Sequence, residues 1–196
     1  MSFDDATKKV YLASGFTVGH YLDALARQDR EGIAEAIHRR FTERYVEPAT
    51  APGGKTHGFT IMAVACLMVE ALESFRRGWP DTSQRGQSEH AFCSFFDGNP
   101  QFGAFQGYAR EFYKGVRCGI LHQAETGVGW RVRRTGDLLR VDGGTRTING
   151  RKFMQALSGA LDHYRDDLTI AGWDDELWRH LRTKMKRVCA NCASQP

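Results

Sequence analysis

Apolar residues recur at spacings of three and four along most of the chain, which is the period of an amphipathic helix. Four such stripes predict helices over residues 22–45, 61–79, 89–96 and 102–122. We expect Pro48 and Pro80 to end the first two, because proline cannot continue a helix interior. Five or six helices in all make a helical bundle the economical architecture.

The second half of the chain contains the one segment with strand periodicity. Residues 130–134 alternate, Thr135-Gly136-Asp137 can form a turn, and residues 138–141 return, which predicts a β-hairpin. Asn149 can cap a following helix over residues 149–168, and a last helix is expected over residues 177–188. The predicted fold is therefore all-α in the main, with a small β-hairpin insertion and C-terminal helices.

Length and composition favour one soluble domain over residues 1–196. Hydrophobic residues make up 41% and charged residues 26%, which excludes wholesale disorder. We expect no membrane span, since the richest apolar stretch, residues 61–72, is interrupted by Glu70. The N-terminal residues lack the apolar core of a secretory signal, so a cytoplasmic location is expected.

The net charge of +4 is compatible with an anionic partner such as RNA, without requiring one. Five cysteines at irregular spacings indicate a reducing compartment rather than a disulfide framework. Cys189 and Cys192 lack a second pair of zinc ligands, so they are interpreted as incidental thiols. Residues 53–56 resemble the end of a phosphate-binding loop, but Ala49 stands where that motif needs glycine.

The segment from Phe112 to Thr126 carries the strongest candidate chemistry, because it places Arg117 and His122 in a mostly apolar helical setting. Histidine transfers protons near neutral pH, and the planar fork of arginine matches phosphate oxygens. The plainer interpretation is that both residues make structural hydrogen bonds. Five residues place the two side chains about 140° apart on an ideal helix. Gly115 and Gly119 could distort that turn, or a two-fold dimer could gather the groups.

This segment resembles the R-x(4–6)-H signature of the HEPN superfamily, and the order of helices before it is similar. The resemblance implies a four- or five-helix core over about residues 1–125, followed by the hairpin and C-terminal helices over 126–196. It implies a metal-independent endoribonuclease of a toxin or antiviral system, with Arg117 and His122 catalytic and no cofactor. The implied partners are a second copy of the chain, RNA, and a cognate antitoxin or defence protein. Cys118 departs from the polar residue often found after the arginine of active members.

Five further residues are weaker candidates for substrate binding: Tyr113, Lys114, Gln123, Glu125 and Glu70. Glu70 and Glu73 lie three residues apart, so a solvated or salt-bridged helix edge is the favoured interpretation. The alternative places Glu70 in a polar pocket near His122. Two other functions stay open: a catalytically inactive HEPN-like dimer that binds RNA or protein, and an unrelated bundle in which His122 is structural.

Overall fold

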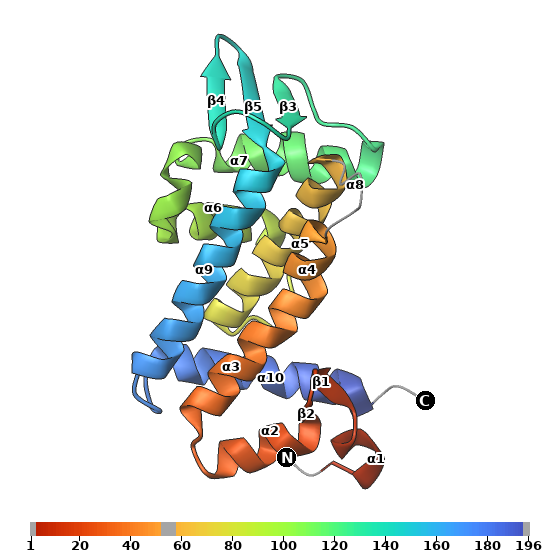
Figure 1. The fold of residues 1–196 in the computed structure, drawn as a ribbon, viewed down its shortest axis with the longest axis vertical. Coiled ribbons are helices and arrows are strands. Elements are labelled where there is room, and N and C mark those ends of the chain that lie inside the picture. The colour runs from red at the N-terminus through yellow and green to blue at the C-terminus, as the bar shows by residue number, and fades with distance from the viewer. Residues whose placement is uncertain (1–2, 52–57, 194–196) are drawn as a thin grey trace. The chain divides into compact units, whose positions relative to one another are not determined.

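The computed structural model describes residues 3–51 and 58–193. Figure 1 shows a chain that is mostly helical with two small sheets, which confirms the predicted mainly-α fold class with a small β insertion. The segment 53–56 considered as a phosphate-binding loop lies outside the described residues.

The chain divides into two compact units. The first comprises Met1–Arg44, Ser74–Asp81 and Leu161–Pro196, and the second comprises Tyr45–Glu73 and Thr82–Ala160. The candidate residues from Glu70 to Glu125 all belong to the second unit, as does the sheet that follows them.

The first unit contains an N-terminal strand pair and several helices. Its elements are α1 (Asp5–Lys8), β1 (Tyr11–Ala13), β2 (Phe16–Thr17), α2 (Val18–Ala26), α3 (Arg30–Phe41) and α10 (Glu176–Ala193). Strands β1 and β2 pair antiparallel. The predicted single helix over 22–45 is wrong at residues 27–29. Gln28 adopts a left-handed φ of 54°, and the Asp29 carboxylate accepts a hydrogen bond from the Gly32 N–H at 2.9 Å, so that Asp29 starts a new helix.

Pro48 does not end the first long helix. After α3 the chain continues through a π-helical turn, η1 (Thr42–Val46), into α4 (Glu47–Thr50). Pro48 lies in the first turn of α4, where a missing N–H and a fixed φ are tolerated.

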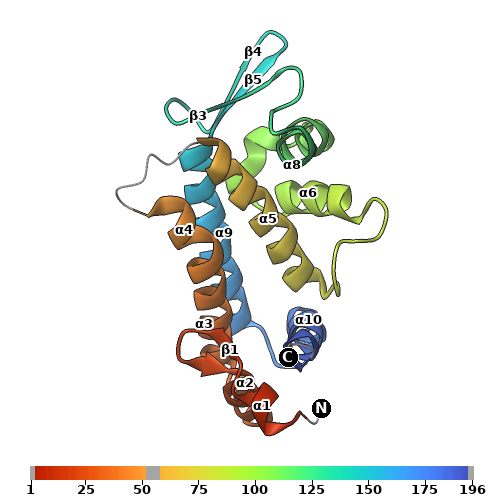
Figure 2. The same cartoon turned by 90° about the vertical axis from the view of Figure 1, so that its right-hand side faces the viewer.

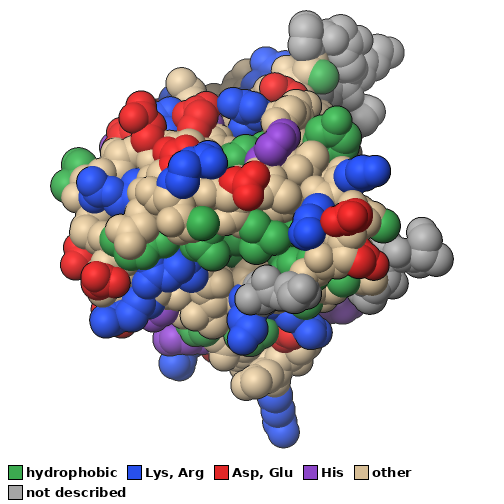
Figure 3. Space-filling model, turned by 90° about the horizontal axis from the view of Figure 1, so that it is seen from below, with side chains coloured by type: hydrophobic (Ala, Val, Ile, Leu, Met, Phe, Trp, Pro, Cys, Tyr) green, Lys and Arg blue, Asp and Glu red, His purple; other side chains and the backbone are tan. Residues whose placement is uncertain are grey.

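Helix α10 packs one face into the first unit. Trp178, Leu181, Met185 and Cys189 are buried at helical spacing, and the Trp178 indole donates to the Leu168 carbonyl at 2.9 Å. Burial raises the pKa of the Cys189 thiol to about 12. Figure 3, seen from below the view of Figure 1, shows acidic and basic side chains interspersed around a band of hydrophobic ones.

The second unit is built on helix α5 and a series of short helical segments. Its helical elements are α5 (Gly58–Arg77), α6 (Gln87–Gly98), η2 (Pro100–Phe105), α7 (Ala109–Phe112), the π-helical η3 (Tyr113–Cys118), α8 (Gly119–Gln123) and α9 (Gly150–Ile170). Helices α5 and α9 each continue into residues of the first unit. The stripe predicted as one helix over 102–122 is thus interrupted, although its apolar positions are buried as expected.

A cluster of seven phenylalanines forms the core beneath α6, η2 and α7. None of its members has measurable exposure: Phe92, Phe95, Phe96, Phe102, Phe105, Phe112 and Phe153. Phe96 lies edge-on to Phe112 at 5.2 Å between ring centroids, and Phe112 stacks on Phe153 at 5.5 Å. Aromatic pairs at these distances add packing energy beyond their buried area. The cluster therefore fixes α7, from which the π-helical segment with Arg117 continues.

The β segment of the second unit has three strands, not a simple hairpin. Its strands are β3 (Trp130–Arg133), β4 (Leu139–Asp142) and β5 (Thr145–Asn149), in the order β3-β5-β4. The predicted pairing of β3 with β4 is wrong, because β5 lies between them, parallel to β3 and antiparallel to β4. The missed strand β5 ends at Asn149, whose side chain accepts from the Arg151 N–H at 3.1 Å and confirms the predicted helix cap.

Helix α5 is long and apolar enough, by length and composition, to cross a membrane. Most of that stretch is buried inside the structure, which is the behaviour of a core helix in a soluble protein. Its N-terminal turn lies against β3, where a Cβ on Gly58 would be 3.1 Å from the Val132 side chain. Figure 2 shows α5, α6 and α8 together below the sheet.

Candidate functional site

The centre of the candidate site is an ion pair between helix α5 and the π-helical segment η3. Arg117 Nε lies 2.7 Å from Glu70 Oε1, and the two side chains are only 17% and 9% exposed. The other carboxylate oxygen, Oε2, accepts from Ser88 Oγ at 2.8 Å and from Thr82 Oγ1 at 3.0 Å. Three donors from three parts of the second unit therefore satisfy Glu70, and a solvated helix edge is excluded.

The guanidinium of Arg117 is fixed through one of its nitrogens and is free at the others. Nε is the nitrogen that Glu70 engages, and neither Nη group has a hydrogen-bond partner or ion pair among the residues described. The Tyr113 ring lies 5.6 Å from the guanidinium carbon, a cation–π contact that covers one face of the group. Arg117 thus presents two uncommitted NH2 groups while its Nε is held by Glu70.

Three groups around Arg117 have shifted pKa values. Burial alone would lower the pKa of Arg117, but the hydrogen bond and charge of Glu70 more than offset it, so that pKa is raised. Burial, followed by a hydrogen bond with Cys118, raises the pKa of the Tyr113 hydroxyl. Burial beside Glu70 also raises the pKa of the Cys66 thiol. Because all three pKa values are raised, each group keeps its proton, and the cluster holds a fixed cation, a neutral phenol and a neutral thiol.

Glycines shape the backbone around this cluster. A Cβ on Gly115 would meet the Trp130 indole ring, and a Cβ on Gly119 would lie 2.5 Å from the Glu125 carbonyl oxygen. The Gly127 N–H donates to the Gly115 carbonyl at 2.6 Å, which ties the loop after α8 onto the π-helical turn. Because these glycines have no side chain, the backbone of the loop can lie this close to the π-helical turn. The distortion suggested by Gly115 is present, since that residue lies inside η3.

His122 has different surroundings from Arg117. It lies near the end of α8 and is exposed, and its imidazole makes no hydrogen bond or ion pair with another described residue. The neighbouring Leu121 is also exposed, at 41%. The structure therefore does not join Arg117 and His122 in one contact, and it does not place Glu70 against His122.

The weaker candidates are distributed around these two residues. Tyr113 is half-buried against Phe92 and Arg117, with ring centroids of Tyr113 and Phe92 5.8 Å apart. Lys114 and Gln123 are exposed. The Glu125 carboxylate accepts from the Thr126 N–H at 2.8 Å, so it holds its own loop. Glu73 is buried at 2% exposure.

Thr82 and Ser88, which complete the hydrogen bonding of Glu70, are not among the candidates that the sequence indicates. No local motif marks either residue. The available signal was Glu70 itself, because a carboxylate inside a strongly apolar helical run needs a buried partner, and Arg117 is the cation inside the other apolar run.

Within the described residues, no group of three His, Cys, Asp or Glu side chains is arranged to hold a metal ion. No protein-family model matches the chain, no curated protein is significantly similar to it in sequence, and no solved structure is significantly similar to it in fold.

Proposed function

We propose that this protein is a metal-independent endoribonuclease of the HEPN type, acting in a toxin or antiviral defence system. One observation carries the proposal: buried Glu70 holds Arg117 through Nε, while both Nη groups lack a partner among the described residues. A guanidinium fixed in this way can bind two oxygens of a phosphate at little further entropic cost.

The reaction uses the nucleophile that RNA already carries. A general base removes the proton of a ribose 2′-OH, the 2′ oxygen bonds to the adjacent phosphorus, and the 5′ oxygen leaves with a proton from a general acid. The products are a 2′,3′-cyclic phosphate and a free 5′-OH. We assign the proton transfers to His122, which is solvent-accessible at the end of α8. Arg117 stabilises the charge that develops on the phosphate oxygens.

A second copy of the chain completes the site in this proposal. Arg117 and His122 share no contact within one protomer, so one protomer alone does not bring the two groups to the same phosphate. A two-fold interface would bring Arg117 of one protomer near the partner subunit's His122. The dimer then contains two such sites, in each of which one His122 accepts the proton of the 2′-OH and returns a proton to the leaving 5′ oxygen through water.

The alternative is a catalytically inactive HEPN-like dimer that binds RNA or a partner protein. One observation favours it: Cys118, the residue after Arg117, interacts with Tyr113 and adds no charged or hydroxyl group beside the guanidinium. In that case the Glu70–Arg117 pair is purely structural.

Incubation of total RNA with the purified protein in EDTA separates the two functions. We expect the wild type to cleave, and His122→Ala and Arg117→Lys each to slow cleavage by about a hundredfold or more, as expected when a proton-transfer group or a transition-state donor is removed. The matched control is His163→Ala, since His163 is also exposed but belongs to the first unit. A wild type that binds RNA without cleaving it, or His122→Ala with the activity of the control, would contradict the proposal.

A further inference from the structure

The three-stranded sheet of the second unit presents two unlike faces. Trp130 and Ile148 on one face are buried, and that face packs on the bundle through Phe112, whose ring centroid lies 5.7 Å from that of Trp130. Alternate residues on β3 and β4, namely Arg131, Arg133 and Arg140, are exposed on the other face. A small sheet that packs one face on a helical bundle leaves its other face in solvent. Burial does not explain why that solvated face carries three arginines.

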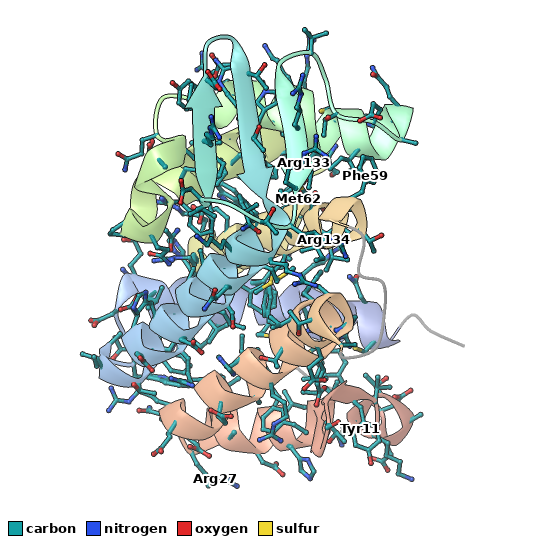
Figure 4. All side chains as sticks on the ribbon, turned by 45° about the horizontal axis from the view of Figure 1, so that its top comes forward. Tyr11, Arg27, Phe59, Met62, Arg133 and Arg134 are labelled. Atoms are coloured by element: carbon teal, nitrogen blue, oxygen red, sulfur yellow. The ribbon has the colours of Figure 1, made fainter. Side chains whose placement is uncertain are left out.

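The residues of the outer face form an open groove of about 480 Å³. Arg131 and Arg140 are both register partners of Thr147, so the three residues form one row across the sheet. Arg133 lies two residues along β3, about 7 Å from Arg131 at the Cα positions. Figure 4 shows Arg133 and Arg134 close to Phe59 and Met62, where β3 meets the first turns of α5.

The side chains of Arg131 and Arg133 make no ion pair or hydrogen bond with another residue that the structure describes. Two carboxylates line the same groove, and both are already engaged by a cation. Asp142 pairs with Arg140 at 3.2 Å, and Asp137 lies 3.9 Å from Lys152. Both pairs are strongly exposed, so water screens them and they offer little resistance to a competing anion.

The sheet is one of two strongly basic segments of the chain. Residues 130–152 contain seven Lys or Arg and two Asp, a surplus of five, whereas the whole chain has a net charge of +4. The other is residues 177–193, with five Lys or Arg and no acid. What distinguishes the sheet is that three of its arginines line one groove, which is the pattern of a surface for a polyanion.

We infer that the outer face of the sheet, made of Arg131, Arg133, Arg140, Thr145 and Thr147, binds the phosphate backbone of a nucleic acid. Arginine forks engage phosphate oxygens in pairs, and threonine hydroxyls donate to the same atoms. The choice of RNA among nucleic acids rests on the proposed function. A protein partner fits less well, because the centre of a protein interface needs a buried aromatic or aliphatic anchor and these positions carry none.

The sheet lies directly beside the candidate catalytic segment. Trp130, at the start of β3, contacts the π-helical turn at Gly115, and Thr126 Oγ1 donates to the Trp130 carbonyl at 2.9 Å. Figure 1 shows β3 as the strand of this sheet nearest to α8. RNA held on the outer face would therefore be kept close to Arg117 and His122.

Binding is tested with a fluorescein-labelled 20-nucleotide single-stranded RNA, by anisotropy over a range of salt concentrations. All proteins carry His122→Ala, so that cleavage does not interfere. We expect Arg131→Gln/Arg133→Gln/Arg140→Gln to bind about tenfold more weakly and to reduce the salt slope by about two, as loss of three phosphate contacts requires. A DNA of the same sequence should show the same losses, since the contacts are to phosphate.

The matched control removes three exposed cations elsewhere: Arg27→Gln/Arg85→Gln/Arg187→Gln. It should change affinity by less than about twofold. If the control weakens binding as much as the sheet variant, or if the wild type does not bind RNA at low salt, the inference is wrong.

The single variant Arg133→Glu repeats the test if the triple variant does not give the wild-type circular dichroism spectrum. A protein that binds through the sheet but does not cleave would overturn the proposed nuclease and leave this inference intact.

Discussion

Arginine occurs in two opposite settings in the second unit. Arg117 is mostly buried, paired with Glu70 and covered by Tyr113, whereas Arg131 and Arg133 are exposed on a sheet without a partner among the described residues. A buried cation has lost its water and depends on the carboxylate beside it. An exposed cation keeps its water and can exchange it for a phosphate.

These two settings predict effects on different properties: folding stability for residues around Arg117, and affinity for RNA for residues on the sheet. We expect changes around Arg117 to alter the free energy of unfolding, because they leave charge or polar groups unpaired in the interior. We expect changes on the sheet to alter affinity for RNA alone, because no interior contact depends on those side chains.

The largest effect on stability is expected for Glu70→Ala. Removal of the carboxylate leaves Arg117, Thr82 and Ser88 without their acceptor, at a cost of about 2–3 kcal/mol in unfolding free energy, less than for a fully buried pair. Urea denaturation measures it, with exposed Glu111→Ala as the control. Equal stability of the two variants would show that the pair does not anchor the site.

Gly115→Ala tests whether the π-helical turn depends on close packing. Its Cβ would be forced against the Trp130 ring, so we expect a loss of about 1–2 kcal/mol from overpacking. Gly103→Ala is the control, since a Cβ there meets nothing within 4 Å. Thermal melting of both variants gives the comparison, and a Gly115→Ala protein as stable as Gly103→Ala would contradict the account of the loop.

The Cys66 thiol beneath Arg117 predicts a pH effect. Burial raises its pKa in the folded state, so the thiol contributes stability that is complete below the unfolded pKa near 8.5 and is lost as pH rises above it. Between pH 7 and 9 the wild type should lose about 1 kcal/mol more unfolding free energy than Cys66→Ala. Half-buried Cys93→Ala is the control and should follow the wild type. Parallel pH curves for Cys66→Ala and the wild type would contradict the burial of this thiol.

The smallest effect on stability is expected from substitutions on the outer face of the sheet. The variant Arg131→Gln/Arg133→Gln/Arg140→Gln should lie within about 0.5 kcal/mol of the wild type in urea denaturation, because these side chains are exposed. A loss comparable with that of Glu70→Ala would remove the contrast between the two settings.

The sequence predicted the helices better than the chain reversals between them. The periodicity of residues 61–79 located α5 to within three residues at each end, because an apolar stripe is a local pattern. The interruption at Gln28 and the position of β5 between β3 and β4 depend on a left-handed residue and on strand order, which a local pattern does not encode.

The sequence likewise predicts only part of the candidate site. Arg117 and Glu70 could each be selected from the sequence as charges in apolar runs, but their pairing joins residues 47 positions apart, and it required the fold. Thr82 and Ser88 belong to no recognisable motif, and only the structure identifies them as hydrogen-bond donors to Glu70.

Mixing two inactive variants tests whether Arg117 and His122 act across the two protomers of a dimer. Arg117→Lys and His122→Ala are each inactive in this account, but a mixed dimer retains one intact arginine and the other protomer's intact histidine. After unfolding and refolding together at equal amounts, the mixture should recover about a quarter of the wild-type cleavage rate in EDTA, because half of the dimers are mixed and each has one complete site. A mixture that stays as inactive as its components would contradict the composite site at Arg117 and His122.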